Sequence, residues 1–186
     1  MILITGGARS GKSTLAEKTA LDIGGKVTYI ATSLPIDEEM ISRISIHKSK
    51  RPDYWGLIEA YRDFDFSKIE TEETLLLDCV TIMVTNILYD EVKDWDSFNQ
   101  MNSENINIAG DVEAVVLTEV KTLIDKMRSK EGNSILVTNE IGLGLVPETF
   151  INRVFRDILG RVNQYLASEA DEVHFCISGI DIKIKG

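Results

Sequence analysis

The fold of this chain is decided by the stretch Gly6-Gly7-Ala8-Arg9-Ser10-Gly11-Lys12-Ser13. An apolar run, Ile2-Leu3-Ile4-Thr5, precedes it, and a helical pattern begins behind it at Thr14. Glycines let the backbone curl so that successive N–H groups point at one phosphate, and the helix start adds its own N–H donors. Lys12 can reach the terminal phosphates, and the Ser13 hydroxyl can bind Mg²⁺. The stretch predicts a phosphate loop that binds a nucleotide; the alternative is a glycine-rich turn with a solvated lysine.

Beyond the loop, strand patterns alternate with helical patterns. Apolar or β-branched runs predict strands over residues 27–31, 75–77, 135–138, 173–177 and 180–184. Apolar residues at helical spacing predict helices over residues 14–23, 35–51, 80–88, 112–127 and from Pro147 onward. Residues 94–111, rich in Asn, Ser and acids, are expected to form a loop. The order predicts one α/β domain over residues 1–186, a P-loop NTPase-type, mostly parallel sheet flanked by helices. Ser178-Gly179 predicts a C-terminal antiparallel hairpin at its edge.

Composition limits the classes of partner. The chain has 186 residues, 30 acidic and 20 basic, and a net charge of −10. Such a charge repels nucleic acid and anionic membranes, so neither is expected as a partner. No apolar run is long enough to span a membrane, and the first residues lack a basic and then apolar pattern, so neither a membrane span nor a signal peptide is expected. Cys79 and Cys176 lie in separate apolar runs, which favours reduced cysteines and a cytoplasmic protein.

A carboxylate follows the apolar run Leu75-Leu76-Leu77, at the position of Asp78. After a phosphate loop, an acid at the end of a buried strand is typical of the residue that holds Mg²⁺. The alternative is that Asp78 caps the helix that follows, and one residue could do both. Thr32-Ser33 ends another strand, at the edge where a parallel sheet holds its ligands.

The segment from Pro35 to Arg51 is a cationic island in an acidic chain. Arg43, Lys48, Lys50 and Arg51 bring four cations into nine residues without an acid, and His47 lies among them. A neutral imidazole nitrogen can attack phosphorus, and nearby cations favour the neutral ring and stabilise charge on the phosphate. His47 is therefore a candidate nucleophile. The alternative is an ordinary surface or core histidine.

Blocks along the whole chain carry a resemblance to a known family. The phosphate loop is joined by Tyr29-Ile30-Ala31-Thr32-Ser33, Arg43-Ile44 with His47, Arg51-Pro52 with Trp55, Asp78-Cys79-Val80-Thr81, Val137-Thr138-Asn139-Glu140, Gly160-Arg161-Val162-Asn163-Gln164 and Ser178-Gly179-Ile180. In these blocks the chain resembles the adenosylcobinamide kinase / adenosylcobinamide-phosphate guanylyltransferase family of cobalamin biosynthesis. Residues 94–111 carry no part of the resemblance.

The resemblance implies two reactions. Adenosylcobinamide takes the γ-phosphoryl group of ATP or GTP, and GMP from GTP is then added to adenosylcobinamide phosphate, with release of pyrophosphate. It implies that His47 carries GMP as a phosphoramidate, and that Lys12 acts with it in catalysis. Asp78 departs modestly from the family pattern. Either acid occurs at this position, and the shorter side chain of aspartate reaches less far toward a metal.

The resemblance also implies a set of nucleotide contacts and a homo-oligomer, with a trimer as the expected state. Besides the loop residues Gly6, Gly7, Ala8, Arg9, Ser10, Gly11, Lys12 and Ser13, the contacts are Ala31, Thr32, Ser33, Lys48, Ser49, Lys50, Arg51, Glu59 and Asp78. Ser13 and Asp78 are the implied Mg²⁺ ligands. Two other functions compete with this one: a simple P-loop small-molecule kinase without guanylyl transfer, and a non-catalytic or motor-like nucleotide-binding module.

Overall fold

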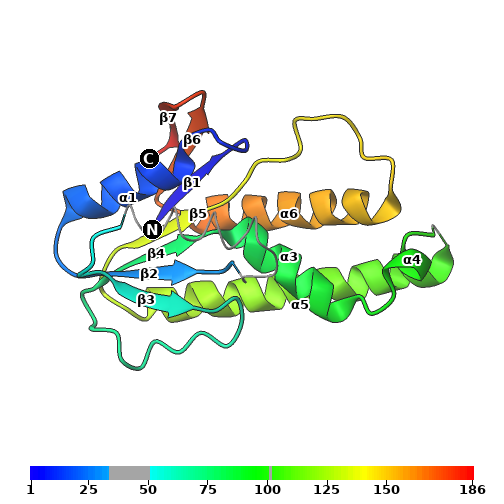
Figure 1. Cartoon of the computed structure of the whole chain (residues 1–186), viewed down its shortest axis with the longest axis horizontal. Helices are drawn as coiled ribbons and strands as arrows, with labels where there is room; N and C mark the ends of the chain where they lie inside the picture. The colour runs from blue at the N-terminus through cyan, green and yellow to red at the C-terminus, as the bar shows by residue number, and fades with distance from the viewer. Residues whose placement is uncertain (34–50, 101) are drawn as a thin grey trace.

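A seven-stranded sheet runs through the computed structural model, which describes residues 1–33, 51–100 and 102–186 (Figure 1). Its strand order is β3-β2-β4-β5-β1-β6-β7. The strands are β1 (Ile2–Gly6), β2 (Val27–Ala31), β3 (Gly56–Glu59), β4 (Thr74–Asp78), β5 (Ser134–Val137), β6 (Glu172–Ile177) and β7 (Ile180–Lys185).

All neighbouring strands pair in parallel except β6 and β7, which form an antiparallel hairpin at one edge. The predicted fold class is therefore confirmed, including the C-terminal hairpin. Strand β3 at the opposite edge was not predicted. Three of its four residues are exposed, so it lacks the apolar pattern that identifies a strand in a sequence.

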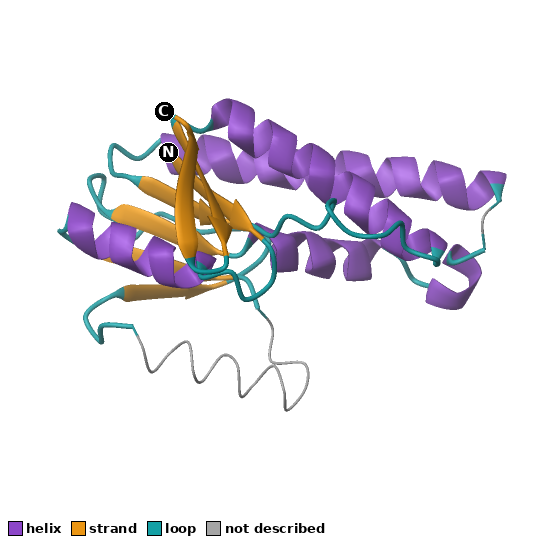
Figure 2. Cartoon of the chain, turned by 90° about the horizontal axis from the view of Figure 1, so that it is seen from above, coloured by secondary structure: helices purple, strands orange, loops and turns teal. Residues whose placement is uncertain are grey.

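The helices lie on both faces of the sheet, with α1 on one face and α3, α5 and α6 on the other (Figure 2). Their bounds are α1 (Lys12–Ile23), α3 (Val80–Glu91), α4 (Trp95–Phe98), α5 (Ser103–Arg128) and α6 (Phe150–Glu169). None of the described helices is long and apolar enough to cross a membrane.

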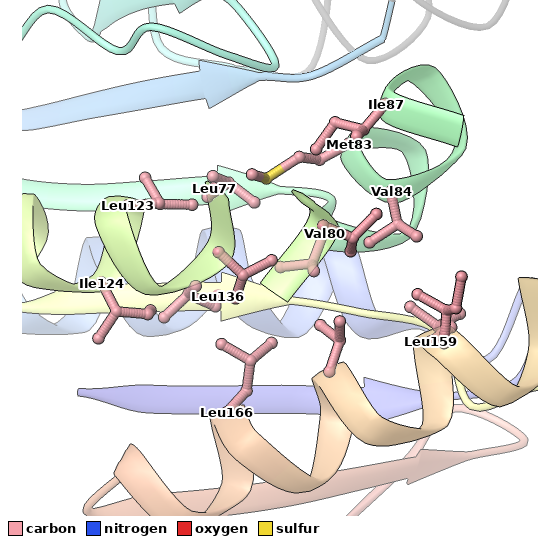
Figure 3. Packing of buried hydrophobic residues seen from close by; sticks show 14 of the residues in the cluster. Leu77, Val80, Met83, Val84, Ile87, Leu123, Ile124, Leu136, Leu159 and Leu166 are labelled. Atoms are coloured by element: carbon pink, nitrogen blue, oxygen red, sulfur yellow. The ribbon is translucent and has the colours of Figure 1, made fainter. Parts of the chain in front are cut away.

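The two faces of the sheet bury alternate side chains of the same strands. On β4, Leu75 and Leu77 pack toward α3, α5 and α6, whereas Leu76 packs with Ala16 and Ala20 of α1. Side chains of a strand point alternately to opposite faces, so a strand buried on both faces is apolar throughout. Figure 3 shows the larger layer, in which Leu77 and Leu136 face the side chains of three helices. This packing fixes the strand ends that carry the polar residues described below.

The loop predicted over residues 94–111 is wrong, because this stretch contains α4 and the first turns of α5. Asn102 caps α5 by accepting a hydrogen bond from the Asn105 backbone N–H at 2.8 Å. The Asn105 side chain donates to the backbone oxygens of Ser97 and Gln100 at 2.7 and 2.6 Å. Asparagine is common both in loops and at helix ends. Here Asn102 caps the start of α5 and Asn105 binds the end of α4, so a composition typical of a loop occurs at two helix ends.

Two further helix predictions differ from the structure. Helix α6 begins at Phe150 rather than at Pro147, and its N-cap residue is Thr149. The helix predicted over residues 35–51 lies outside the described residues, apart from Arg51.

Candidate nucleotide-binding site

The phosphate loop connects β1 to α1, as predicted, and glycines are required at two of its positions. Gly6 has φ 147°, and a Cβ there would lie 2.2 Å from the backbone oxygen of Cys176 on β6. Gly11, the N-cap of α1, has φ 101°. The Gly179 N–H of the hairpin turn donates to the Ser10 backbone oxygen at 3.0 Å. The loop is thus held between β1 and the C-terminal hairpin.

Lys12 is buried at the start of α1, with only 7% of its surface exposed. Its Nζ donates to the Gly7 backbone oxygen at 2.6 Å, across the base of the loop. Burial lowers the pKa of Lys12, and the nearby Asp78 carboxylate opposes that shift. An anion entering the loop would meet a desolvated ammonium group, where charge attraction is stronger than in water.

A cavity of about 530 Å³ opens above the loop. It brings together six loop residues, Ala8 to Ser13, with residues at or just beyond the carboxyl ends of β2, β3, β4 and β5. Seventeen of the described residues contribute to its lining, and the predicted site residues among them outside the loop are Ala31, Ser33, Arg51, Glu59 and Asp78. Ligands of open α/β sheets bind at this end of the strands.

Asp78 lies in this cavity and does not cap α3. The N-cap residue of α3 is Cys79, and its side chain makes no capping hydrogen bond, so the alternative of a capping Asp78 is wrong. The Tyr29 hydroxyl donates to Asp78 Oδ2 at 3.0 Å instead.

Asp78 and Ser13 offer a carboxylate and a hydroxyl to the same cavity. Both are hard oxygen donors of the kind that Mg²⁺ prefers. Within the described residues, no group of three or more His, Cys, Asp or Glu side chains is placed to hold a metal. This donor set fits a Mg²⁺ ion that keeps most of its water and takes further ligands from phosphates.

Among the predicted contact residues that the structure describes, three do not line the cavity: Gly6, Gly7 and Thr32. Gly6 is the last residue of β1, and the Gly7 backbone oxygen accepts the hydrogen bond from Lys12. Thr32 is 1% exposed, and its hydroxyl donates to the backbone oxygen of Cys79 at 2.8 Å and accepts from the Cys79 N–H at 3.0 Å. Asn86 of α3 donates to the Thr32 backbone oxygen at 2.8 Å. Thr32 thus ties the end of β2 to the end of β4 beneath the cavity.

The predicted residues His47, Lys48, Ser49 and Lys50 lie outside the described residues. Arg51 is the first described residue after them and lines the cavity. Its guanidinium carbon lies 3.7 Å from the centroid of the Tyr29 ring. The cationic segment therefore ends at the cavity.

Sequence reasoning missed several lining residues: Thr14, Tyr29, Cys79, Ile82, Val137 and Asn139. Asn139 follows the end of β5, and the Asn163 side chain of α6 donates to its backbone oxygen at 2.9 Å. Its position just beyond a buried strand could have identified Asn139 as a residue of the site. The position of Tyr29 did not identify it as a residue of the site, because aromatic residues are common within strands. Burial raises the pKa of the Cys79 thiol to about 12, so this thiol is protonated and unreactive at neutral pH.

Comparison with known proteins points to one family. A family model described as cobinamide kinase / cobinamide phosphate guanyltransferase matches residues 2–184. The chain is 44% identical to the bifunctional adenosylcobalamin biosynthesis protein CobU of Escherichia coli, covering 100% of this chain and 99% of the relative. It is 42% identical to the CobU protein of Salmonella typhimurium, with the same coverage. It is 35% identical to the bifunctional adenosylcobalamin biosynthesis protein CobP of Pseudomonas aeruginosa, covering 99% and 96%.

The matches run from end to end of the chain and include the phosphate loop and the strand ends that form the cavity. They confirm the resemblance drawn from the sequence blocks. The chain therefore belongs to the cobinamide kinase / cobinamide phosphate guanyltransferase family.

Proposed function

We propose that this chain is a bifunctional transferase that phosphorylates adenosylcobinamide and then joins GMP to the product. ATP or GTP supplies the phosphoryl group in the first reaction, and GTP supplies GMP in the second, giving adenosylcobinamide-GDP and pyrophosphate. The observation that carries the proposal is the cavity of about 530 Å³, which joins the phosphate loop to Asp78 and Arg51 in a chain of this family.

In the proposed site, the loop amides and Lys12 bind the phosphates of the triphosphate. Ser13 and Asp78 would hold Mg²⁺, which offsets negative charge on the phosphates when it is bound. Ala31, Ser33, Arg51 and Glu59 line the cavity and are proposed to contact the nucleotide. Thr32 would act indirectly, by holding the ends of β2 and β4 together.

For the second reaction we propose His47 as the nucleophile, on the basis of its sequence context. Its neutral ring nitrogen attacks the α-phosphorus of GTP, a P–N bond forms, and the P–O bond to pyrophosphate breaks. A phosphate oxygen of adenosylcobinamide phosphate then displaces the histidine and receives GMP. Lys48, Ser49, Lys50 and Arg51 would supply contacts and positive charge to the phosphates.

We further propose that the chain acts as one domain and assembles into a homo-oligomer, with a trimer as the expected state. An interface at the edge strand β7 is supported by its exposed isoleucines, which alternate with charged residues, because exposed apolar side chains on an open edge strand favour association; they are Ile180, Ile182 and Ile184. Light scattering after gel filtration tests the subunit number. A cytoplasmic location is supported by the free thiols of Cys79 and Cys176.

The histidine assignment has a matched control, because the chain contains only two histidines. Incubation with GTP labelled on the α-phosphate should leave acid-labile, base-stable label on the wild-type protein. His47→Ala should abolish the label. His174→Ala should retain it, because His174 lies on β6 against Asp181, at 2.9 Å, and outside the cavity lining. Label that survives in His47→Ala would refute the assignment.

Product analysis separates the two enzyme functions. Mass spectrometry of adenosylcobinamide incubated with GTP and Mg²⁺ should show the mass of a GMP adduct of its phosphate. A product that carries phosphate alone would indicate a simple kinase. Triphosphate hydrolysis without a modified corrinoid would indicate a nucleotide-binding module.

A further inference from the structure

The buried hydroxyl of Tyr29 makes a hydrogen bond to Asp78 that has no part in the reactions proposed above. Tyr29 is 3% exposed, lies in the middle of β2 and lines the nucleotide cavity. Its hydroxyl donates to Asp78 Oδ2 at 3.0 Å, across the parallel pair of β2 and β4. A buried phenol normally finds a partner, but this partner is the carboxylate that faces the phosphate loop.

The bond constrains one oxygen of Asp78 and leaves the other available. Over residues 1–33, 51–100 and 102–186, Tyr29 is the only residue whose side chain donates a hydrogen bond to this carboxylate, and it does so at Oδ2. Oδ1 is thereby left to accept from a metal-bound water or to meet a cation. A fixed donor on one oxygen also sets the plane of the carboxyl group, because a hydrogen-bond partner of a metal-binding side chain orients that side chain.

A second contact holds the ring of Tyr29 in place. The guanidinium of Arg51 lies over the ring at 3.7 Å, which holds the ring by a cation–π contact. The ring therefore contacts Arg51 and the hydroxyl binds Asp78, so one side chain joins two parts of the site.

We propose that Tyr29 is a positioning residue that orients Asp78 toward the magnesium ion of the nucleoside triphosphate. This inference rests on the role of Asp78 under the proposed function. Tyr29 does not touch the reacting atoms. It acts through the carboxylate, so its removal should weaken the contribution of Mg²⁺ to nucleotide binding and should leave binding without Mg²⁺ nearly unchanged.

The test measures the affinity of the whole protein for an α,β-imido analogue of GTP, which cannot lose pyrophosphate. Dissociation constants are determined by calorimetry with Mg²⁺ and with EDTA, and their ratio gives the magnesium enhancement. Tyr29→Phe keeps the ring and the Arg51 contact but removes the hydroxyl. Loss of a hydrogen-bond partner of a metal ligand lowers metal affinity roughly 10–100-fold, and we expect the magnesium enhancement to fall about tenfold, because water can partly replace the phenol.

Tyr61→Phe provides the matched control. The Tyr61 hydroxyl also donates to a carboxylate, Asp90, at 3.1 Å, and Arg62 likewise lies beside that pair, at 3.0 Å from Asp90. Neither Tyr61 nor Asp90 lines the cavity. This variant should keep the wild-type enhancement.

The Asp78→Asn background distinguishes failure of the inference from failure of the proposed function. If Tyr29 acts through Asp78, Asp78→Asn abolishes most of the enhancement, and adding Tyr29→Phe changes it no further. Full enhancement in Tyr29→Phe with its loss in Asp78→Asn would overturn the inference alone. So would additive effects, or equal weakening with Mg²⁺ and with EDTA. Full enhancement in Asp78→Asn would overturn the proposed metal role of Asp78 and the inference with it.

Discussion

Replacing Gly6 by alanine should displace the phosphate loop, because no side chain fits between β1 and β6. A Cβ at this position would lie 2.2 Å from the backbone oxygen of Cys176 and 2.9 Å from the Ser10 hydroxyl. The φ of 147° adds a conformational penalty for any L side chain. Gly6 also pairs with Cys176 in the β1–β6 register, so the backbone cannot move freely.

The expected destabilisation combines two costs. A non-glycine residue in a sparsely populated backbone region costs of order 1–3 kcal/mol. The Cβ and the carbonyl oxygen must separate by about 0.8 Å to reach even the 3.0 Å limit of real contacts, and such overpacking costs typically about 1–3 kcal/mol. A total of about 3 kcal/mol lowers the melting temperature by roughly 6–12 °C in a chain of this size.

Gly7→Ala is the matched control in the same loop. A Cβ at Gly7 would meet no atom within 4 Å, and its φ lies outside the positive region. Thermal unfolding followed by circular dichroism, without nucleotide, should place Gly7→Ala within about 2 °C of the wild type, since a strain-free Gly→Ala change is neutral or slightly stabilising. The assay isolates the steric effect from the loss of phosphate contacts.

The result that would refute the reasoning is a Gly6→Ala protein that melts within about 2 °C of the wild type. Equal losses for Gly6→Ala and Gly7→Ala would also refute it, because the effect would then depend on glycine content and not on the contact with β6.

Three further outcomes are expected. Lys12→Ala should lower both phosphoryl and guanylyl transfer by roughly 10²–10³-fold in kcat, whereas Lys18→Ala, an exposed position on α1, should leave both rates near wild type. Cys79, whose burial raises its thiol pKa to about 12, should react with iodoacetamide at pH 7 at least about tenfold more slowly in the native protein than in urea. Hydrogen bonding by Lys183 holds the pKa of Glu172 below 4.5, so its stabilising effect should be present above that pH and be lost as the pH falls. Melting temperatures of Glu172→Gln should therefore fall less between about pH 5 and pH 3 than those of the wild type.

The sequence by itself determined the phosphate loop and most of the sheet. The conformation of residues 6–13 can be predicted from local sequence alone, because glycine torsion angles and the start of a helix depend on adjacent residues. Strands such as β4 and β5 are buried on both faces, so their composition is apolar throughout and their positions were correctly predicted. Asp78 was placed correctly at a strand end for the same reason.

Only the tertiary structure decided which of these strand ends meet. Strand β3 is an exposed edge strand that depends on β2 for its hydrogen bonds, and the caps of α4 and α5 depend on contacts between turns. The bond between Tyr29 and Asp78 joins residues 49 positions apart, and Arg51 meets the Tyr29 ring from a third segment. Such contacts follow from the order β3-β2-β4 in the sheet. Strand order is set by long-range pairing and by helix packing on both faces, which no local pattern of residues specifies.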